Sequence, residues 1–316
     1  MGQDRGSRTW LLQASLAALG FDARLAAVRG FTSDPAPYVF PNEALFPYVC
    51  LRVLVDGQPV WLDTMVRFGP FGELPEFALG EREAFLLPRP GQQLEKVTTP
   101  KRNERPSKSI TLTASLDAEG VLKGQGEETY VGFEAAQLSE ALEQLSPDQR
   151  KQALEQALSR MFGGADLESI DVETKREEGA QVKVKYVFTA THFARKESES
   201  SMVLGALTFP WNLGRRFLML GQRVTPLFLE ASESTHSLVT LTVPEGFRLK
   251  EPMPDVKTEC PWGRFNRKES QAGRVITIEE DARLLQSRVP VKEYERFGQF
   301  AGEADLLQGR DLLLVK

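Results

Sequence analysis

The chain has 316 residues and a formal net charge of −5, from 39 Lys and Arg against 44 Asp and Glu. This mild acidity disfavours a nucleic-acid binder, because such proteins usually carry a basic surplus. Two cysteines and two histidines exclude a zinc ribbon or another Cys/His metal cluster, so we expect neither a metal nor a cofactor. No apolar run reaches the roughly 18 residues that a membrane-spanning helix requires.

The first predicted element is a helix over 8–19. Apolar side chains recur there at helical spacing, and Gly20 follows at the position where a helix would stop. The apolar positions are Trp10, Leu11, Ala14, Ala17 and Ala18. Residues 22–29 alternate in polarity and predict a strand, whereas the Gly, Pro, Asp and Asn content of 30–45 predicts a loop.

A β-hairpin is expected next. The stretches 48–55 and 60–63 are rich in β-branched and aromatic residues, and Asp56 and Gly57 between them are a strong signal for a tight hairpin turn. Residues 66–80 contain several glycines and prolines and predict another loop.

A domain boundary is expected after this region. The stretch from Pro88 to Lys108 holds four prolines, many charges and few large apolar residues, which is typical of a linker. We therefore divide the chain into an N-terminal domain over 1–90, a linker over 91–108 and a C-terminal domain over 109–316.

The C-terminal domain is predicted to be rich in strands, with one long helix over about 147–162. That helix has a capping box formed by Ser146 and Gln149, with Pro147 in its first turn. A short closing helix is expected around Phe297. Strands are expected at 109–116, 121–131, 168–176, 181–191, 235–243 and 273–280. The whole pattern predicts an α+β protein.

Three N-terminal segments carry a family resemblance. They are Gly6–Arg24, Phe46–Tyr48 and Val60–Thr64, and their order and spacing resemble the bacterial transglutaminase-like family of the papain-like superfamily. The resemblance implies the back half of that catalytic core, a helix packed on an antiparallel sheet. The sequence beyond about residue 95 resembles the β-rich domain of unknown function that follows this core in many bacterial envelope proteins.

The resemblance also implies where a catalytic triad would stand. The cysteine position falls on Arg5, or on Asp4 in the alternative alignment, the histidine position on Tyr48 and the aspartate position on Asp63. A guanidinium stays protonated and a tyrosine is a poor base at neutral pH, so two of the three roles are unfilled. We expect no catalytic residues, and we expect Arg5, Tyr48 and Asp63 to form a structural hydrogen-bond cluster instead.

Cys50 is the fallback candidate for a nucleophile. It lies two residues after Tyr48, so both side chains would point to the same face of a strand. A reactive thiol needs an activating neighbour, and the sequence offers Cys50 no adjacent histidine. An active site would have to recruit Cys50 or Cys260 together with His192 or His236.

Two functions from different classes remain open. The first is a non-catalytic binding or scaffold module with a protein or peptide partner, located by resemblance in the periplasm or cell envelope. The second is an active cysteine acyltransferase or peptidase that uses a recruited Cys and His. A truncated chain is a further expectation, because the upstream helices of the family are absent and no signal peptide precedes the first helix. Oligomeric state is not constrained.

Overall fold

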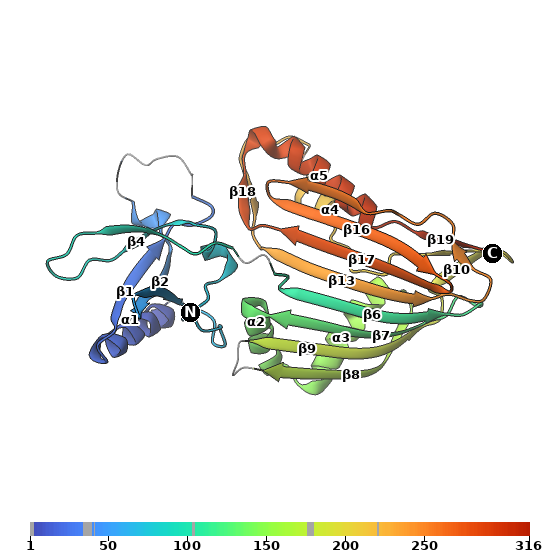
Figure 1. Ribbon diagram of the computed structural model, residues 1–316, viewed down its shortest axis with the longest axis horizontal. Coiled ribbons are helices and arrows are strands. Elements are labelled where there is room, and N and C mark those ends of the chain that lie inside the picture. The colour runs from blue at the N-terminus through green and yellow to red at the C-terminus, as the bar shows by residue number, and fades with distance from the viewer. Residues whose placement is uncertain (1–2, 34–39, 41, 103–104, 176–179, 220) are drawn as a thin grey trace.

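The computed structural model describes residues 3–33, 40, 42–102, 105–175, 180–219 and 221–316, without the side chains of 3–7. The fold is α+β, as the sequence predicts, with 23% helix and 42% strand. A small N-terminal domain lies beside a larger one built on a broad sheet (Figure 1). None of the described helices is both long enough and apolar enough to cross a membrane.

The N-terminal domain is one helix packed on a five-stranded sheet. The sheet order is β3-β2-β1-β4-β5, and every pairing in it is antiparallel. Leu12 and Leu16 of the helix pack against Leu25, Leu51 and Val53 of the sheet. The elements are α1 (Gln3–Ala18), β1 (Asp22–Val28), η1 (Glu43–Leu45), β2 (Tyr48–Val55), β3 (Gln58–Leu62), η2 (Glu76–Ala78), β4 (Glu83–Leu86) and β5 (Glu95–Thr98).

The hairpin predicted in this domain is confirmed. Strands β2 and β3 pair in register from Leu51–Leu62 to Val55–Gln58. The intervening Asp56 and Gly57 have φ values of 50° and 76°, the left-handed conformation that a two-residue hairpin turn requires. Strands β4 and β5 were not predicted, and β5 is a correction to the expectation that 91–108 is only linker, because it extends the sheet along β4.

The C-terminal domain is organised around an eight-stranded sheet of order β15-β16-β17-β13-β6-β7-β9-β8. Strands β13 and β6 pair in parallel, and the other neighbours are antiparallel. The strands are β6 (Lys108–Leu116), β7 (Leu122–Val131), β8 (Ala165–Lys175), β9 (Gln181–Ala190), β13 (Glu233–Thr242), β15 (Val256–Cys260), β16 (Gly263–Ala272) and β17 (Val275–Leu284).

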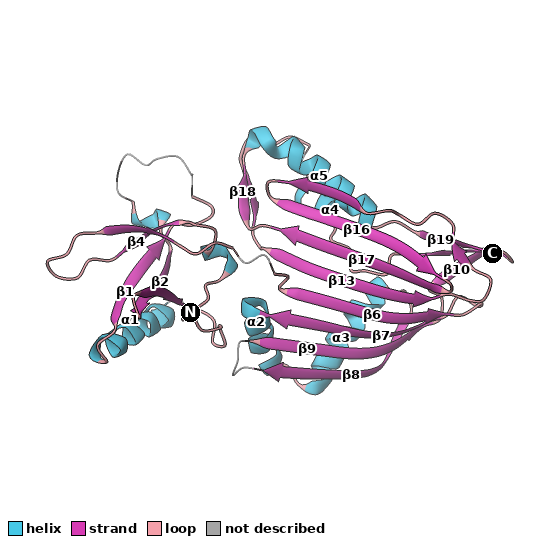
Figure 2. Cartoon of the chain, in the orientation of Figure 1, coloured by secondary structure: helices cyan, strands magenta, loops and turns pink. Residues whose placement is uncertain are grey.

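Helices and a second, smaller sheet cover one face of this large sheet, while the face toward the viewer in Figure 2 carries no helix. The helices are α2 (Gly132–Glu143), α3 (Pro147–Met161), α4 (Leu213–Phe217), η3 (Val291–Glu293) and α5 (Tyr294–Gln308). The small sheet has the order β10-β11-β19-β14, and β12 pairs with β18. Their bounds are β10 (Ala194–Ser198), β11 (Ser201–Leu204), β12 (Leu227–Leu229), β14 (Arg248–Leu249), β18 (Ser287–Val289) and β19 (Leu312–Val315).

Helix α3 has the capping box expected from its sequence. The Ser146 side chain accepts from the Gln149 amide, and the Gln149 side chain accepts from the Ser146 amide. The expectation of a single long helix is wrong, because α2 has 12 residues and α5 has 15. Helix α2 begins at Gly132, which has a φ of +65°. No side chain caps this end of the helix, so the sequence carries no capping signal for it.

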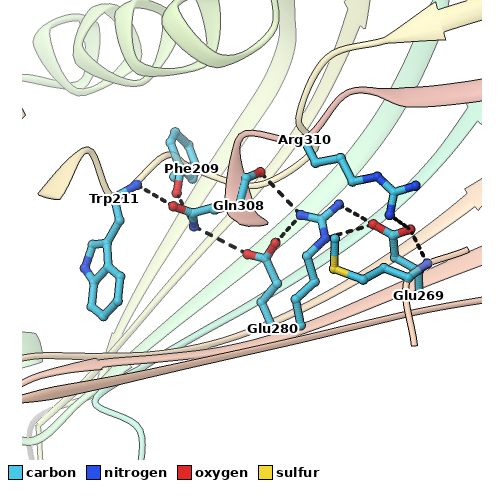
Figure 3. Close-up of polar contacts among 8 residues, drawn as sticks. Phe209, Trp211, Glu269, Glu280, Gln308 and Arg310 are labelled. Atoms are coloured by element: carbon cyan, nitrogen blue, oxygen red, sulfur yellow. Dashed lines mark hydrogen bonds and ion pairs between the residues drawn. The ribbon is translucent and has the colours of Figure 1, made fainter. Parts of the chain in front are cut away.

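The inner face of β16 and β17 contains a buried ionic network (Figure 3). The Arg267 side chain is fully buried and forms ion pairs with both Glu269 and Glu280. Gln308, at the end of α5, donates to Glu280, and Arg310 lies 3.6 Å from Glu269. The network therefore joins the sheet to the segment between α5 and β19. Strand β16 was not predicted, because two of its inward positions, Arg267 and Glu269, carry charges.

Candidate functional site

Tyr48 and Asp63, two positions that the family resemblance singled out, meet at the five-stranded sheet of the N-terminal domain. Tyr48 opens β2, and Asp63 follows the last residue of β3. The Tyr48 hydroxyl donates a hydrogen bond of 2.7 Å to Asp63 Oδ1. Asp63 Oδ2 accepts from the backbone amides of Met65 and Val66 at 2.9 and 3.2 Å. The predicted contact between Tyr48 and Asp63 is confirmed, whereas the side chains of Arg5 and Asp4 lie outside the described residues.

Cys50 lies behind this pair on the same face of β2, as strand alternation predicts. Its side chain is fully buried, and Sγ lies 3.8 Å from the carbonyl oxygen of Ala26. Burial, followed by the charge of Asp63, raises the pKa of the Cys50 thiol far above its ordinary value. Burial likewise raises the pKa of Tyr48. Both groups therefore stay protonated at neutral pH, and the thiol has no open path to solvent.

The other cysteine and the two histidines belong to the C-terminal domain. Cys260 ends β15 half-buried, and burial raises the pKa of its thiol. His192 contacts the Thr191 hydroxyl at 3.1 Å in an exposed loop. His236, on β13, contacts Asp281 Oδ1 at 3.0 Å through its Nδ1. Throughout the described part of the chain, no hydrogen bond joins a cysteine to a histidine.

One group of side chains has the donor atoms that a metal ion would use. His236, Glu279 and Asp281 each place one such atom within 4.8 Å of the others. His236 and Asp281 are register partners on β13 and β17, and Glu279 lies two residues away on the same face. Sequence spacing alone could not reveal this group, since it depends on strand pairing between positions 45 apart.

A groove of about 830 Å³ lies between the two domains. Its N-terminal wall comes from the loop around Pro70 and Pro75 together with Phe77 of η2. Its C-terminal wall includes Phe133 at the start of α2 and the segment 230–234. No sequence motif marks this groove, because its residues come from six separate parts of the chain.

The groove adjoins the Tyr48–Asp63 pair. The Phe77 ring lines the groove and packs edge-on against the Tyr48 ring, with centroids 4.9 Å apart. Five acidic and three basic residues border the groove. The acidic ones are Glu73, Glu76, Glu134, Glu230 and Glu233, and the basic ones are Arg105, Lys175 and Arg283. The groove thus combines an apolar wall with a surplus of carboxylates, and the Tyr48–Asp63 pair lies one layer behind it.

Comparison with known proteins gives two similarities. Residues 206–314 match the model of DUF3858, described as a domain of unknown function with a solved structure. This match supports the expected domain of unknown function over the C-terminal third. The fold resembles a crystal structure from Parabacteroides distasonis ATCC 8503 described as a "putative protease", with a TM-score of 0.48 and 14% identity. That similarity covers 98% of this chain but 43% of the other. No curated protein matches.

Proposed function

We propose that this protein is a non-catalytic binding module that holds an extended polypeptide segment in the groove between its two domains. The observation that carries the proposal is the groove itself, about 830 Å³ in volume and walled by both domains. Junctions between domains are frequent places for ligand sites, since two surfaces supply a concave wall. The resemblance of the N-terminal segments to the transglutaminase-like family supports a polypeptide as the ligand and the cell envelope as the location.

We propose no catalytic activity, because the hydrogen bonds of Asp63 and the protonation of the Cys50 thiol do not suit catalysis. Asp63 is occupied by the Tyr48 hydroxyl and two backbone amides. The Cys50 thiol is buried, and its raised pKa keeps it in the neutral form, which is a poor nucleophile. A nucleophile and a base within hydrogen-bond reach are the minimum for acyl transfer. The proposal therefore assigns Tyr48 and Asp63 to supporting the groove wall behind Phe77.

The lining indicates what kind of segment would bind. Aromatic rings at Phe77 and Phe133 offer apolar contact, and Pro70 and Pro75 add to the apolar part of the lining. The acidic surplus favours lysine or arginine side chains on the ligand through charge complementarity. A peptide that combines apolar and basic residues is thus the expected occupant.

Fluorescence anisotropy with labelled decapeptides tests this function. One peptide carries leucine and lysine, and its counterpart carries glutamate at each lysine position. We expect saturable binding of the basic peptide and at least tenfold weaker binding of the acidic one. The Phe133→Ala and Glu73→Lys variants should weaken binding of the basic peptide at least tenfold, whereas Phe71→Ala should not, because Phe71 is exposed and does not line the groove. Binding that ignores Phe133 and Glu73, or no binding at all, contradicts the proposal.

A further inference from the structure

We propose that four side chains on the large sheet form a binding site for a divalent transition-metal ion, with Zn²⁺ as the ion that fits the donors best. They are His236 on β13, Asn266 on β16, and Glu279 and Asp281 on β17. None of the four lines the groove. This inference concerns a different ligand and does not rest on the polypeptide-binding function proposed above.

Strand pairing brings these side chains together. Asp281 has His236 as its register partner on one side and Asn266 on the other, because β17 lies between β13 and β16. Residues directly opposite each other on antiparallel strands have Cβ atoms about 4.5–5.5 Å apart. Glu279 lies two residues before Asp281 and therefore projects from the same face of the sheet. The four side chains thus converge from three adjacent strands.

The group lies on the face of the sheet that carries no helix (Figure 2). Ile278 and Glu280 are buried on the inner face, so Glu279 and Asp281, which alternate with them, point to the opposite side. The side chains of His236 and Asp281 are 34% and 47% exposed. An ion can therefore reach these donors from solution without any rearrangement of the core.

The donor atoms are already spaced for one ion. His236 Nδ1 lies 3.0 Å from Asp281 Oδ1, and one ligand atom from each of His236, Glu279 and Asp281 falls within 4.8 Å of the others. Zinc bonds to nitrogen and oxygen measure about 2.0–2.2 Å, which places two ligand atoms of a tetrahedral ion roughly 3.3–3.6 Å apart. Small side-chain rotations are enough to reach this spacing. Glu279 can rotate, since it forms no hydrogen bond or ion pair with any described residue, its register partner Lys268 included.

Asn266 provides a second, independent observation. Its Oδ1 is buried and has no hydrogen-bond partner among the described residues. A buried acceptor without a partner is costly, so a ligand that satisfies it stabilises the folded state. A cation bound next to Asp281, the register partner of Asn266, would give this amide oxygen a partner. Side-chain amide oxygens are established ligands of divalent cations.

The donor types define the ion. Carboxylate and amide oxygens alone would suit Mg²⁺ or Ca²⁺, whereas an imidazole nitrogen favours zinc and its first-row neighbours. The two carboxylates balance the charge of a divalent ion. The low count of cysteine and histidine led us to expect no metal, but that argument applies to Cys/His clusters and not to a mixed nitrogen and oxygen set.

Isothermal titration calorimetry of the untagged, chelator-treated protein with zinc chloride and with magnesium chloride tests the site. We expect saturable binding of one Zn²⁺ per chain, at least tenfold tighter than binding of Mg²⁺. His236→Gln and Asp281→Asn should each weaken Zn²⁺ binding at least tenfold. His192→Gln is the matched control, because His192 is the other of the two histidines and lies in an exposed loop. Circular dichroism confirms that each variant is folded.

Proton NMR of the histidine ring signals gives a second readout, taken on the unmutated protein. The chain has two histidines, so two sets of ring signals are expected, and His192→Gln assigns them. Zinc should shift the His236 signals and leave those of His192 in place. Equal shifts of both histidines, or no saturable Zn²⁺ binding, would overturn the proposal. Equal affinities for Zn²⁺ and Mg²⁺, or a Zn²⁺ affinity unchanged by His236→Gln and Asp281→Asn, would also overturn it.

Discussion

The Tyr48 hydroxyl donates a 2.7 Å hydrogen bond to Asp63, and this bond ties the first residue of β2 to the residue that follows β3. Asp63 also accepts from the amides of Met65 and Val66, so one carboxylate fixes the loop that leads toward the groove. The Tyr48 ring in turn supports Phe77, which lines that groove. The Tyr48–Asp63 pair therefore supports one wall of the groove.

Replacing Tyr48 and replacing Asp63 should each lower the free energy of unfolding, by different amounts. Tyr48→Phe deletes one donor to a partly buried carboxylate and should cost about 1–3 kcal/mol. Asp63→Ala deletes the acceptor of three hydrogen bonds and should cost more. Urea unfolding followed by the fluorescence of Trp61, which is buried in β3, measures both losses. If Asp63→Ala were no more destabilising than Tyr48→Phe, the structural role given to the carboxylate would be wrong.

Thiol labelling distinguishes the proposed binding function from the alternative of an active cysteine enzyme. Cys50 should resist a disulfide reagent at pH 7 in the folded protein and react only on unfolding, because it is fully buried. Cys260 should react, but more slowly than a free cysteine, because burial raises its pKa. The Cys50→Ala and Cys260→Ala variants assign each rate. Fast stoichiometric labelling of one cysteine in the folded protein at neutral pH would favour the enzyme.

The sequence predicted the parts of the fold in which local pattern and tertiary structure agree. The first four residues of β1 alternate in burial, Asp56 and Gly57 suit their turn, and Ser146 caps α3. Helix α2 was missed because Gly132, a poor helix residue, begins it after an extended strand residue. In each case the local residue pattern determined whether the element could be predicted from the sequence.

Strand β16 shows why pattern alone fails in the second domain. Its inward positions include Arg267 and Glu269, which are buried only because they pair with each other and with Glu280 on β17. A reading by hydrophobic alternation takes such residues for a solvated surface. Sequence reasoning likewise found one part of the candidate site and missed another. The Tyr48–Asp63 contact was expected from the resemblance, whereas the groove depends on how the two domains pack.

The N-terminal sheet should lose stability in acid through Glu83. Hydrogen bonds from Lys96 and then Arg29, at 2.8 Å each, hold the pKa of this carboxyl below its ordinary value. A lowered folded-state pKa contributes stability above the unfolded value of about 4.3, and that contribution is lost as the pH falls through the folded pKa. Glu83→Gln should flatten the dependence of unfolding free energy on pH below about 5, and Lys96→Met should flatten it partly. Urea unfolding at several pH values tests this, and an unchanged slope in Glu83→Gln would contradict it.

The buried Arg267 should be far more important for stability than an exposed arginine. Arg267→Met leaves Glu269 and Glu280 without their shared cation in the interior, and breaking a buried pair in this way typically costs about 3–5 kcal/mol. Arg195→Met is the matched control, because its exposed pair with Glu197 should contribute less than about 1 kcal/mol. Adding Glu280→Gln to Arg267→Met should recover part of the loss, since it removes the buried charge that Arg267 neutralised at Glu280. Urea unfolding followed by the fluorescence of Trp262 measures each variant, and equal losses for Arg267→Met and Arg195→Met would show that the network does not stabilise this domain.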